Sequence, residues 1–460
     1  MNGESAESPQ ASEIPADDPD RGEAGHARAV GAAAAPRRVS WGWPEAAVLA
    51  LSLALRVVII SHATPQLVAD ARDYHALAES LLASRSYQQQ YDGETTAYHG
   101  LTFYAYRMPG YPIFLALVYG VFGWRPLYAY LANVLCDLVA EIFALLIGRR
   151  LFGRSVGLAA QALFALHVLW TPALMTESLF TALFAALAFL VVSGRVAASV
   201  TTALGFGCVL AASVFVRPIA LAVVPAALWR IARARSLGGA ALLGVLALAP
   251  SALGLAGWAA RNHARLGEVV LFSTNLAFHN SREFPIDRAG IVRAAVSRGL
   301  NEAQINRLLF GEIGQAVRRA PGRAAGIYLR RVVELFSPRR PRNHLWWHAF
   351  EGPGGSRLVT RLYRSLALQY LVTYPLALVG TVVLLRRGRS SGGLWSLIGS
   401  FALVHALVSN GNLRFAAPLY PLFCVLAGCG IAGLVAGQPA MRDRLGGGPG
   451  RGRERDSVSR

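Results

Sequence analysis

The sequence predicts an all-α polytopic integral membrane protein, and three observations support that prediction. The chain of 460 residues is 54% hydrophobic and only 15% charged, which is too apolar for an ordinary soluble protein of this length. Its apolar runs recur at the length that a bilayer core requires, roughly 17–25 residues for each helix. Its arginines cluster between these runs and at the ends of the chain. We therefore expect about ten transmembrane helices with both termini in the cytoplasm.

The expected spans follow the apolar runs along the chain. They cover residues 44–61, 126–148, 156–173, 178–194, 198–216, 218–232, 237–258, 366–385, 393–409 and 414–437. With this assignment the short arginine-rich loops all fall on one side, as the positive-inside rule requires. The apolar run 111–123 is too short to cross a bilayer, so we expect an interfacial or re-entrant helix there.

The chain outside the spans divides into two tails and two outer loops. The expected organisation is a disordered cytoplasmic tail (1–42), a transmembrane domain (43–437) and a second disordered cytoplasmic tail (438–460). Residues 62–110 and 259–365 then face outward, and the second segment is long enough to be exempt from the charge rule. Within it, residues 301–320 place apolar side chains at helical spacing, which predicts a surface helix.

Composition excludes several chemistries. The sequence contains no lysine, so all 45 positive residues are arginines and neither a Walker A loop nor a Schiff-base lysine is available. The formal charge of +19 comes from arginines that lie beside the apolar runs and at the termini. We therefore interpret them as orientation signals that face anionic lipid, rather than as a surface that binds nucleic acid. The four cysteines fall inside expected spans, so neither a disulfide framework nor a metal set is indicated.

Charged side chains gather at the outer ends of the expected spans. They are Asp70, Asp73, Arg107, Glu177, Arg217 and Arg414. Glu177 lies among apolar residues, where a carboxylate is costly, so it is expected to face a cavity and to have a partner. Arginine suits phosphate because its planar guanidinium donates two parallel hydrogen bonds. Solvated surface positions stay open for the aspartates, and snorkelling to the interface stays open for Arg217, Arg414 and, in the first span, Arg56.

Short motifs follow one another along the chain. They are Asp70-x-x-x-Tyr74-x-x-x-Ala78, Arg107-Met-Pro-Gly-Tyr-Pro112, Thr176-Glu-Ser178, Arg217-Pro218, Trp258-Ala-Ala-Arg261-Asn262, Ser273-Thr-Asn275 and Asn412-Leu-Arg414-Phe. In order and spacing this series resembles the polytopic GT-C glycosyltransferases, particularly the protein O-mannosyltransferase and aminoarabinose-transferase branch of the bacterial glycosyltransferase family 39 type. Ala71 follows Asp70 where the protein mannosyltransferases carry an acidic pair, and no loop can hold their added luminal domain. A bacterial transferase of undefined acceptor is the better match.

The resemblance implies a GT-C fold with extracytoplasmic loops. It also implies transfer of a sugar from a polyprenyl-phosphate donor to an acceptor hydroxyl of a glycan, lipid or protein in the cell envelope. The active site would face outward from the inner (plasma) membrane, where nucleotide sugars are not supplied, so position also favours a lipid-linked donor. No obligatory organic cofactor is expected, and a role for a divalent cation stays open.

The implied chemistry assigns roles to individual residues. Direct displacement at the anomeric carbon needs a carboxylate base opposite the leaving phosphate and would invert the configuration. Asp70 is the first candidate for this base and Asp73 the alternative, while Glu177 would orient the acceptor, bind an ion or hold an arginine. The expected substrate-binding residues are Tyr74, Arg107, Arg217, Arg414 and Asn275, with the arginines stabilising the leaving phosphate.

Two other classes stay open. A polytopic lipid or glycolipid transporter, or flippase, would place ionisable residues near the bilayer midplane within internal repeats. The sequence shows no repeat, and its candidate charges are expected at one surface. A membrane scaffold without catalytic activity would not need acids and arginines clustered on one face.

Overall fold

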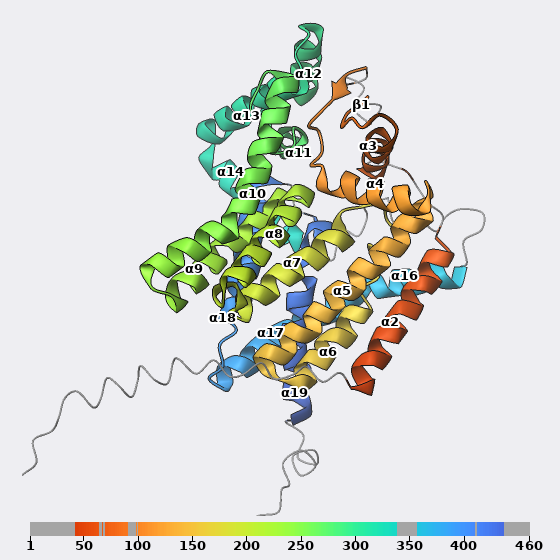
Figure 1. Cartoon of the computed structure of the whole chain (residues 1–460), viewed down its shortest axis with the longest axis vertical. Helices are drawn as coiled ribbons and strands as arrows, with labels where there is room; N and C mark the ends of the chain where they lie inside the picture. Colours follow the sequence, from red (N-terminus) through yellow and green to blue (C-terminus); the bar gives the residue numbers. More distant parts are fainter. Residues whose placement is uncertain are drawn as a thin grey trace, which may run out of the picture. The chain divides into compact units, whose positions relative to one another are not determined.

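The computed structural model describes residues 42–63, 67, 70–90, 98, 100–337, 357–409 and 412–436. The expected tails lie almost wholly outside these residues. Regular structure in the described chain is helical except for two short antiparallel strands, β1 (Gln89–Gln90) and β2 (Thr102–Phe103). The prediction of an all-α protein is therefore confirmed (Figure 1).

Ten α-helices overlap the expected spans, one helix for each span. They are α2 (Trp43–Ser61), α5 (Pro126–Phe152), α6 (Arg154–Ala165), α7 (Glu177–Val192), α8 (Val200–Val216), α9 (Val224–Ala234), α10 (Leu237–Leu266), α17 (Tyr370–Arg386), α18 (Gly392–Val408) and α19 (Tyr420–Ala436). The connecting 3-10 turns are η2 (Arg195–Ala197), η3 (Pro218–Val223), η5 (Ala367–Gln369) and η6 (Leu413–Leu419). Among the described residues, four segments are long and apolar enough to cross a membrane: Trp43–Ser61, Pro126–Phe152, Leu237–Leu266 and Leu413–Ala436. The full count of ten spans stays a prediction.

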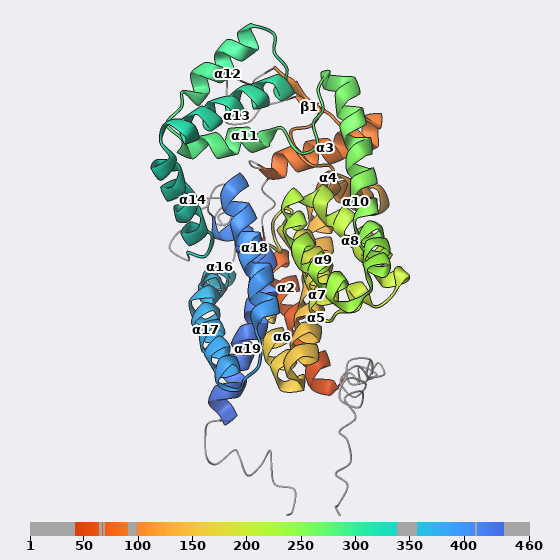
Figure 2. The same ribbon diagram turned by 90° about the vertical axis from the view of Figure 1, so that its left-hand side faces the viewer.

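The two expected outer loops meet at one end of this bundle. Their helices are α3 (Asp70–Ser84), α11 (Asn275–Asn280), α12 (Arg288–Ser297), α13 (Glu302–Arg319), α14 (Pro321–Leu335) and α16 (Arg357–Leu366), with the turn η4 (Ser281–Glu283). Helix α4 (Gly110–Phe122) matches the short helix expected over residues 111–123. Figures 1 and 2 show α3 and α11–α13 together beyond the ends of α5, α7 and α8. Helix α13 confirms the helix expected over residues 301–320. Helix α10, about 45 Å long from its 30 residues, reaches from the bundle into this group.

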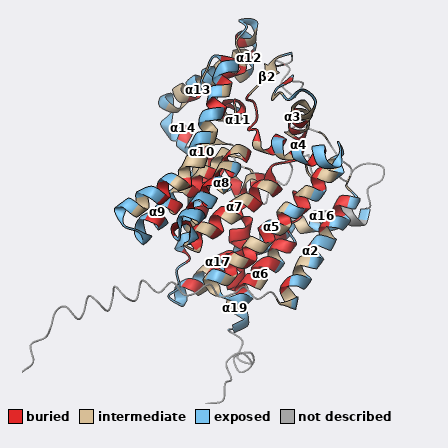
Figure 3. Cartoon of the chain, viewed as in Figure 1, coloured by how far each residue is buried: buried red, intermediate tan, exposed pale blue. Residues whose placement is uncertain are grey.

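Helix α19 lies in the centre of the bundle, packed against α5, α6 and α17. All its residues from Tyr420 to Gly430 are buried. Figure 3 shows buried residues gathered on the inner faces of the bundle helices. Close approach to α17 depends on Gly380, because a Cβ added there would lie 1.8 Å from the carbonyl oxygen of Leu426. Small residues at crossing points are how helices pack in lipid, where no hydrophobic effect draws them together.

Two expectations about the bundle are wrong. The span expected over residues 156–173 does not continue as a helix, because α6 ends at Ala165 and α7 begins only at Glu177. The ionisable side chains also do not all lie at the outer surface. Arg56 from α2 is fully buried beside Asp137 and Glu141 from α5, so snorkelling is excluded for this arginine. Helix periodicity predicted neither feature, since both depend on partners from other helices.

Candidate active site

Arg107 joins the two aspartates of the outer helix α3. Its Nη2 donates to Asp70 Oδ1 at 2.6 Å and to Asp73 Oδ2 at 2.6 Å, and its Nε donates to Asp73 Oδ2 at 3.0 Å. Both aspartates stand in the first turn of α3, where the helix dipole stabilises negative charge. The surface-only reading of these residues is therefore wrong.

Arg414 links Asp70 to the buried Glu177. Its Nη1 donates to Asp70 Oδ2 at 2.8 Å, and its Nε donates to Glu177 Oε1. Arg217 also donates to Glu177 Oε1 through Nη2, and its Nε donates to Thr176 Oγ1 at 2.6 Å. Glu177 has no exposed surface, and its Oε2 has no hydrogen-bond partner among the described residues.

These contacts define the acid–arginine cluster: Asp70, Asp73, Glu177, Arg107, Arg217 and Arg414. Three carboxylates balance three guanidinium groups, so the cluster has a formal charge of zero. Its members come from α3, from the segment before α4, from the start of α7, from the end of α8 and from η6. All six site residues predicted from charge and position thus lie in one network, at the end of the bundle where the outer segments meet.

Local sequence explains how several members reach the cluster. Helix α8 ends at Val216 because Pro218 forces Arg217, the residue before it, into extended backbone, with φ −149° and ψ 117°. Asn412 accepts a hydrogen bond from the backbone N–H of Arg414 at 3.0 Å, which sets the start of η6. Tyr74, one turn after Asp70, lies with its ring centroid 5.4 Å from the Arg107 guanidinium. Its ring also packs edge to face on Tyr111 of α4.

Gly110 lets α4 begin directly against the end of α8. A Cβ at this position would lie 2.6 Å from the backbone carbon of Phe215 and 2.7 Å from the nitrogen of Val216, next to Arg217. The Pro-Gly-Tyr-Pro motif therefore permits the close approach that brings Arg107 and Arg217 to the same site.

Gly110→Ala is expected to separate α4 from α8. Backbone atoms cannot rotate away as a side chain can, so overpacking should cost about 1–3 kcal/mol of folding free energy. Thermal unfolding of the detergent-purified protein measures this loss, and Gly257→Ala is the matched control because a Cβ there meets nothing within 4 Å. Equal melting temperatures for the two variants would contradict this account.

The segment that carries Arg107 is held by residues that sequence reasoning missed. Glu302 accepts hydrogen bonds from the backbone N–H groups of Tyr104, at 2.5 Å, and Ala105, at 2.8 Å. The Tyr87 hydroxyl donates to the carbonyl of Arg107 at 3.0 Å. Burial raises the pKa of Glu302, although its hydrogen bonds oppose that effect. No sequence signal identified Glu302, because it reads as an ordinary first-turn acid of α13.

Helix α11 begins at Asn275, the remaining residue predicted to bind substrate. Asn275 accepts a hydrogen bond from Ser273 Oγ at 2.8 Å, and none of its described hydrogen bonds reaches the acid–arginine cluster. Its substrate-binding role stays a prediction. Burial lowers the pKa of His279, on the same helix, to about 3, and the charge of Arg107 acts in the same direction. The His279 imidazole is therefore neutral at physiological pH.

The two cationic partners of Asp70 control its protonation. Burial raises the pKa of Asp70, but the charges of Arg107 and Arg414 outweigh that effect and hold the pKa well below its usual range. Asp70 is thus ionised and a weak base while both arginines bind it. Among the described residues, no group of three or more His, Cys, Asp or Glu side chains is placed to hold a metal ion.

Comparison with known proteins supports the fold. No protein-family model and no curated protein sequence matches the chain. The apo oligosaccharyltransferase of Archaeoglobus fulgidus matches with a TM-score of 0.50 and 15% identity, over 83% of this chain and 50% of that one. The same organism's AglB, in complex with an inhibitory peptide and a dolichol-phosphate, matches with a TM-score of 0.48 and 12% identity, over 89% and 53%.

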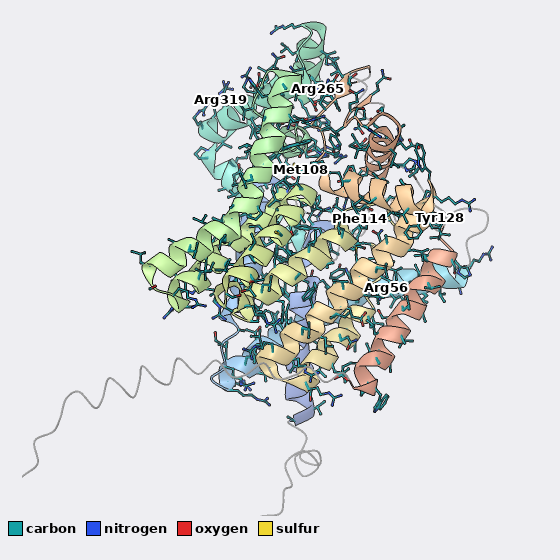
Figure 4. The ribbon with its side chains drawn as sticks, viewed as in Figure 1. Arg56, Met108, Phe114, Tyr128, Arg265 and Arg319 are labelled. Carbon is teal, nitrogen blue, oxygen red and sulfur yellow. The ribbon has the colours of Figure 1, made fainter. Side chains whose placement is uncertain are left out.

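A second type of solved structure also matches. ArnT from Cupriavidus metallidurans bound to undecaprenyl phosphate gives a TM-score of 0.37 and 16% identity, over 85% of this chain and 78% of that one. The chain spans about half the length of the oligosaccharyltransferases that it matches. The likeness to the apo oligosaccharyltransferase shows that this chain has the GT-C fold, as the motif series predicted. Figure 4 labels Met108, the residue after Arg107, near the junction between the outer helices and the bundle.

Proposed function

We propose that the chain is a membrane glycosyltransferase that moves a sugar from a polyprenyl-phosphate donor to an acceptor hydroxyl of the cell envelope. The observation that carries the proposal is the acid–arginine cluster at the end of the bundle where the outer segments meet. It combines three guanidinium groups suited to a phosphate with carboxylates suited to activating a hydroxyl. The GT-C fold agrees with this chemistry.

The arginines would exchange partners when the donor binds. Arg107 and Arg414 now donate to Asp70 at 2.6 and 2.8 Å. A sugar-phosphate group offers competing oxygens, and its charge grows as the bond to the sugar breaks, so these guanidinium groups bind it best in the transition state. The exchange would release Asp70 from both cations.

Release from the arginines would make Asp70 a stronger base at the step that needs one. Its pKa rises toward the ordinary range once the guanidinium groups turn to the phosphate. The acceptor oxygen attacks the anomeric carbon, the bond from that carbon to the phosphate oxygen breaks, and the acceptor proton passes to Asp70. The configuration at the sugar is inverted. Asp73 is the alternative base, and its Oδ2 accepts both donors of Arg107 in the present arrangement.

The site is proposed to face outward from the inner (plasma) membrane, with ten spans and both ends of the chain in the cytoplasm. A reporter fused after Gly388, between α17 and α18, is then expected to behave as cytoplasmic. One fused at Gly290, in α12, is expected to behave as external. Arginines 386, 387 and 389 flank the first position, and positive short loops are retained inside. The reverse pattern would refute the topology.

The activity itself can be measured on purified protein. We expect release of polyprenyl phosphate only when a polyprenyl-phosphate sugar and envelope lipids or glycans as acceptor are both present. A Thr381→Val variant, which loses the partly buried hydrogen bonds of Thr381 with Ala377 and Trp395, should release polyprenyl phosphate at the wild-type rate. Transfer from a nucleotide sugar alone would contradict the proposal.

The alternative is a polytopic lipid or glycolipid transporter or flippase. One observation favours it, namely the ionisable side chains of Arg56, Asp137 and Glu141 inside the bundle. Protein groups satisfy these side chains in the described structure, which weakens a role in transport. Lipid movement across vesicles without any transfer would favour this alternative.

A further inference from the structure

The segment between α6 and α7 is irregular backbone buried inside the bundle. Helix α6 has 12 residues and spans about 18 Å, whereas the preceding α5 has 27 residues and spans about 40 Å. After Ala165 the chain follows no regular helix until Glu177, yet His167 and Thr171 are buried. Irregular backbone within a membrane bundle is tolerated only where protein groups satisfy its polar atoms.

Arg56 satisfies the carbonyls that α6 leaves open at its end. Its Nη1 donates to the carbonyl of Ala165 at 3.0 Å, and its Nη2 donates to that of His167 at 3.0 Å. A cation at a helix C-terminus also complements the helix dipole. Arg56 comes from α2, within the bundle and away from Met108 of the outer end (Figure 4). It therefore fixes where α6 stops.

Two side chains of α5, one turn apart, hold the middle of the same segment. Asp137 Oδ2 accepts a hydrogen bond from Thr171 Oγ1 at 2.5 Å. Asn133 Nδ2 donates to the carbonyl of Thr171 at 3.2 Å and to that of Ala173 at 2.7 Å. The anchored backbone then leads within a few residues to Thr176 and Glu177, which bind Arg217.

We propose that Arg56, Asp137 and Asn133 are positioning residues that hold the segment 166–176 and thereby place Glu177 against Arg217 and Arg414. Stability alone is a weak reason for such an arrangement, because buried ion pairs can often be replaced by apolar residues without loss. The role rests on the proposed function, since it acts through the acid–arginine cluster. By placing Glu177, these residues would hold the guanidinium groups of Arg217 and Arg414 in position to bind a phosphate.

Asn133→Leu is the sharpest test, because it removes both hydrogen bonds without leaving an unpaired buried charge, as Arg56→Met would. We expect kcat to fall about tenfold or more through displacement of the site. In a Glu177→Gln background the same change should have little further effect, because the group that it positions is already lost. An equal loss in both backgrounds would show a purely structural role and overturn the proposal.

A second measurement does not depend on activity. Leu174 is buried within the segment, so Leu174→Cys in a chain whose four natural cysteines are replaced by alanine should resist a water-soluble maleimide. Asn133→Leu is expected to increase its labelling rate severalfold, whereas the control Thr381→Val should not. Unchanged labelling would overturn the inference, even if transfer activity proved the proposed function right. Increased labelling in a protein without transfer activity would support the anchoring while the proposed function failed.

Discussion

Asp70→Asn is expected to lower kcat by about 10²–10⁴-fold, the usual cost of removing a general base. The amide cannot take the acceptor proton, although it keeps the shape of the side chain. The KM for the donor should change by a smaller factor than kcat, because Arg107 keeps its contacts with Asp73. Turnover of a polyprenyl-phosphate sugar by purified variants measures the effect.

Asp73→Asn is the matched control for this prediction. It removes a carboxylate of the same helix turn that also binds Arg107, so any effect of losing charge is shared by the two variants. We expect Asp73→Asn to retain more activity than Asp70→Asn. A folded Asp70→Asn protein with nearly normal turnover would exclude Asp70 as the base, and a larger loss in Asp73→Asn would transfer the role to Asp73.

The pH dependence of stability gives an independent check on Asp70. Its pKa is lower in the folded protein than its ordinary value, so folding favours the ionised form. The stability from its ion pairs is then fully present above the unfolded pKa of about 3.9 and is lost as the pH falls through the folded pKa. The difference in melting temperature between wild type and Asp70→Asn should stay constant from about pH 5 to 8 and shrink below about pH 4.

Glu177→Gln is expected to destabilise the protein by about 3–5 kcal/mol and to abolish most transfer. Arg217 and Arg414 both donate to the same oxygen of this fully buried carboxylate. The neutral amide leaves Arg217 without its carboxylate partner and Arg414 with Asp70 alone, so the cluster gains a net positive charge. The resulting repulsion should also move both guanidinium groups away from the place where the phosphate would bind.

Denaturation in detergent measures the loss, and two further variants sharpen the result. Glu268→Gln breaks an ion pair with the 70% exposed Arg307, so it should cost only about 0–1 kcal/mol. The double variant Glu177→Gln/Arg217→Gln should regain stability over Glu177→Gln without regaining activity, because one unpaired charge is removed with its partner. A stable and active Glu177→Gln protein would show that Glu177 does not hold the arginines.

Local sequence patterns were enough to predict the class of fold and most members of the acid–arginine cluster. Hydropathy located helices because the length of an apolar run is a local property, and α2, α5 and α10 begin within a residue of their expected starts. Motif order identified Asp70, Glu177 and Arg414 as members of one site. It did so although Arg414 and Asp70 are 344 positions apart in the chain.

The pairing and support of these residues come from contacts between distant helices. The end of α6 at Ala165 depends on Arg56 of α2, and the place of Arg107 depends on Glu302 of α13. In both cases the partner that satisfies a buried polar group comes from a distant helix, so no local periodicity or propensity signals it. The expected helix over residues 156–173 was wrong for that reason: apolar composition permits a helix there, but long-range hydrogen bonds from α2 and α5 stabilise irregular backbone instead.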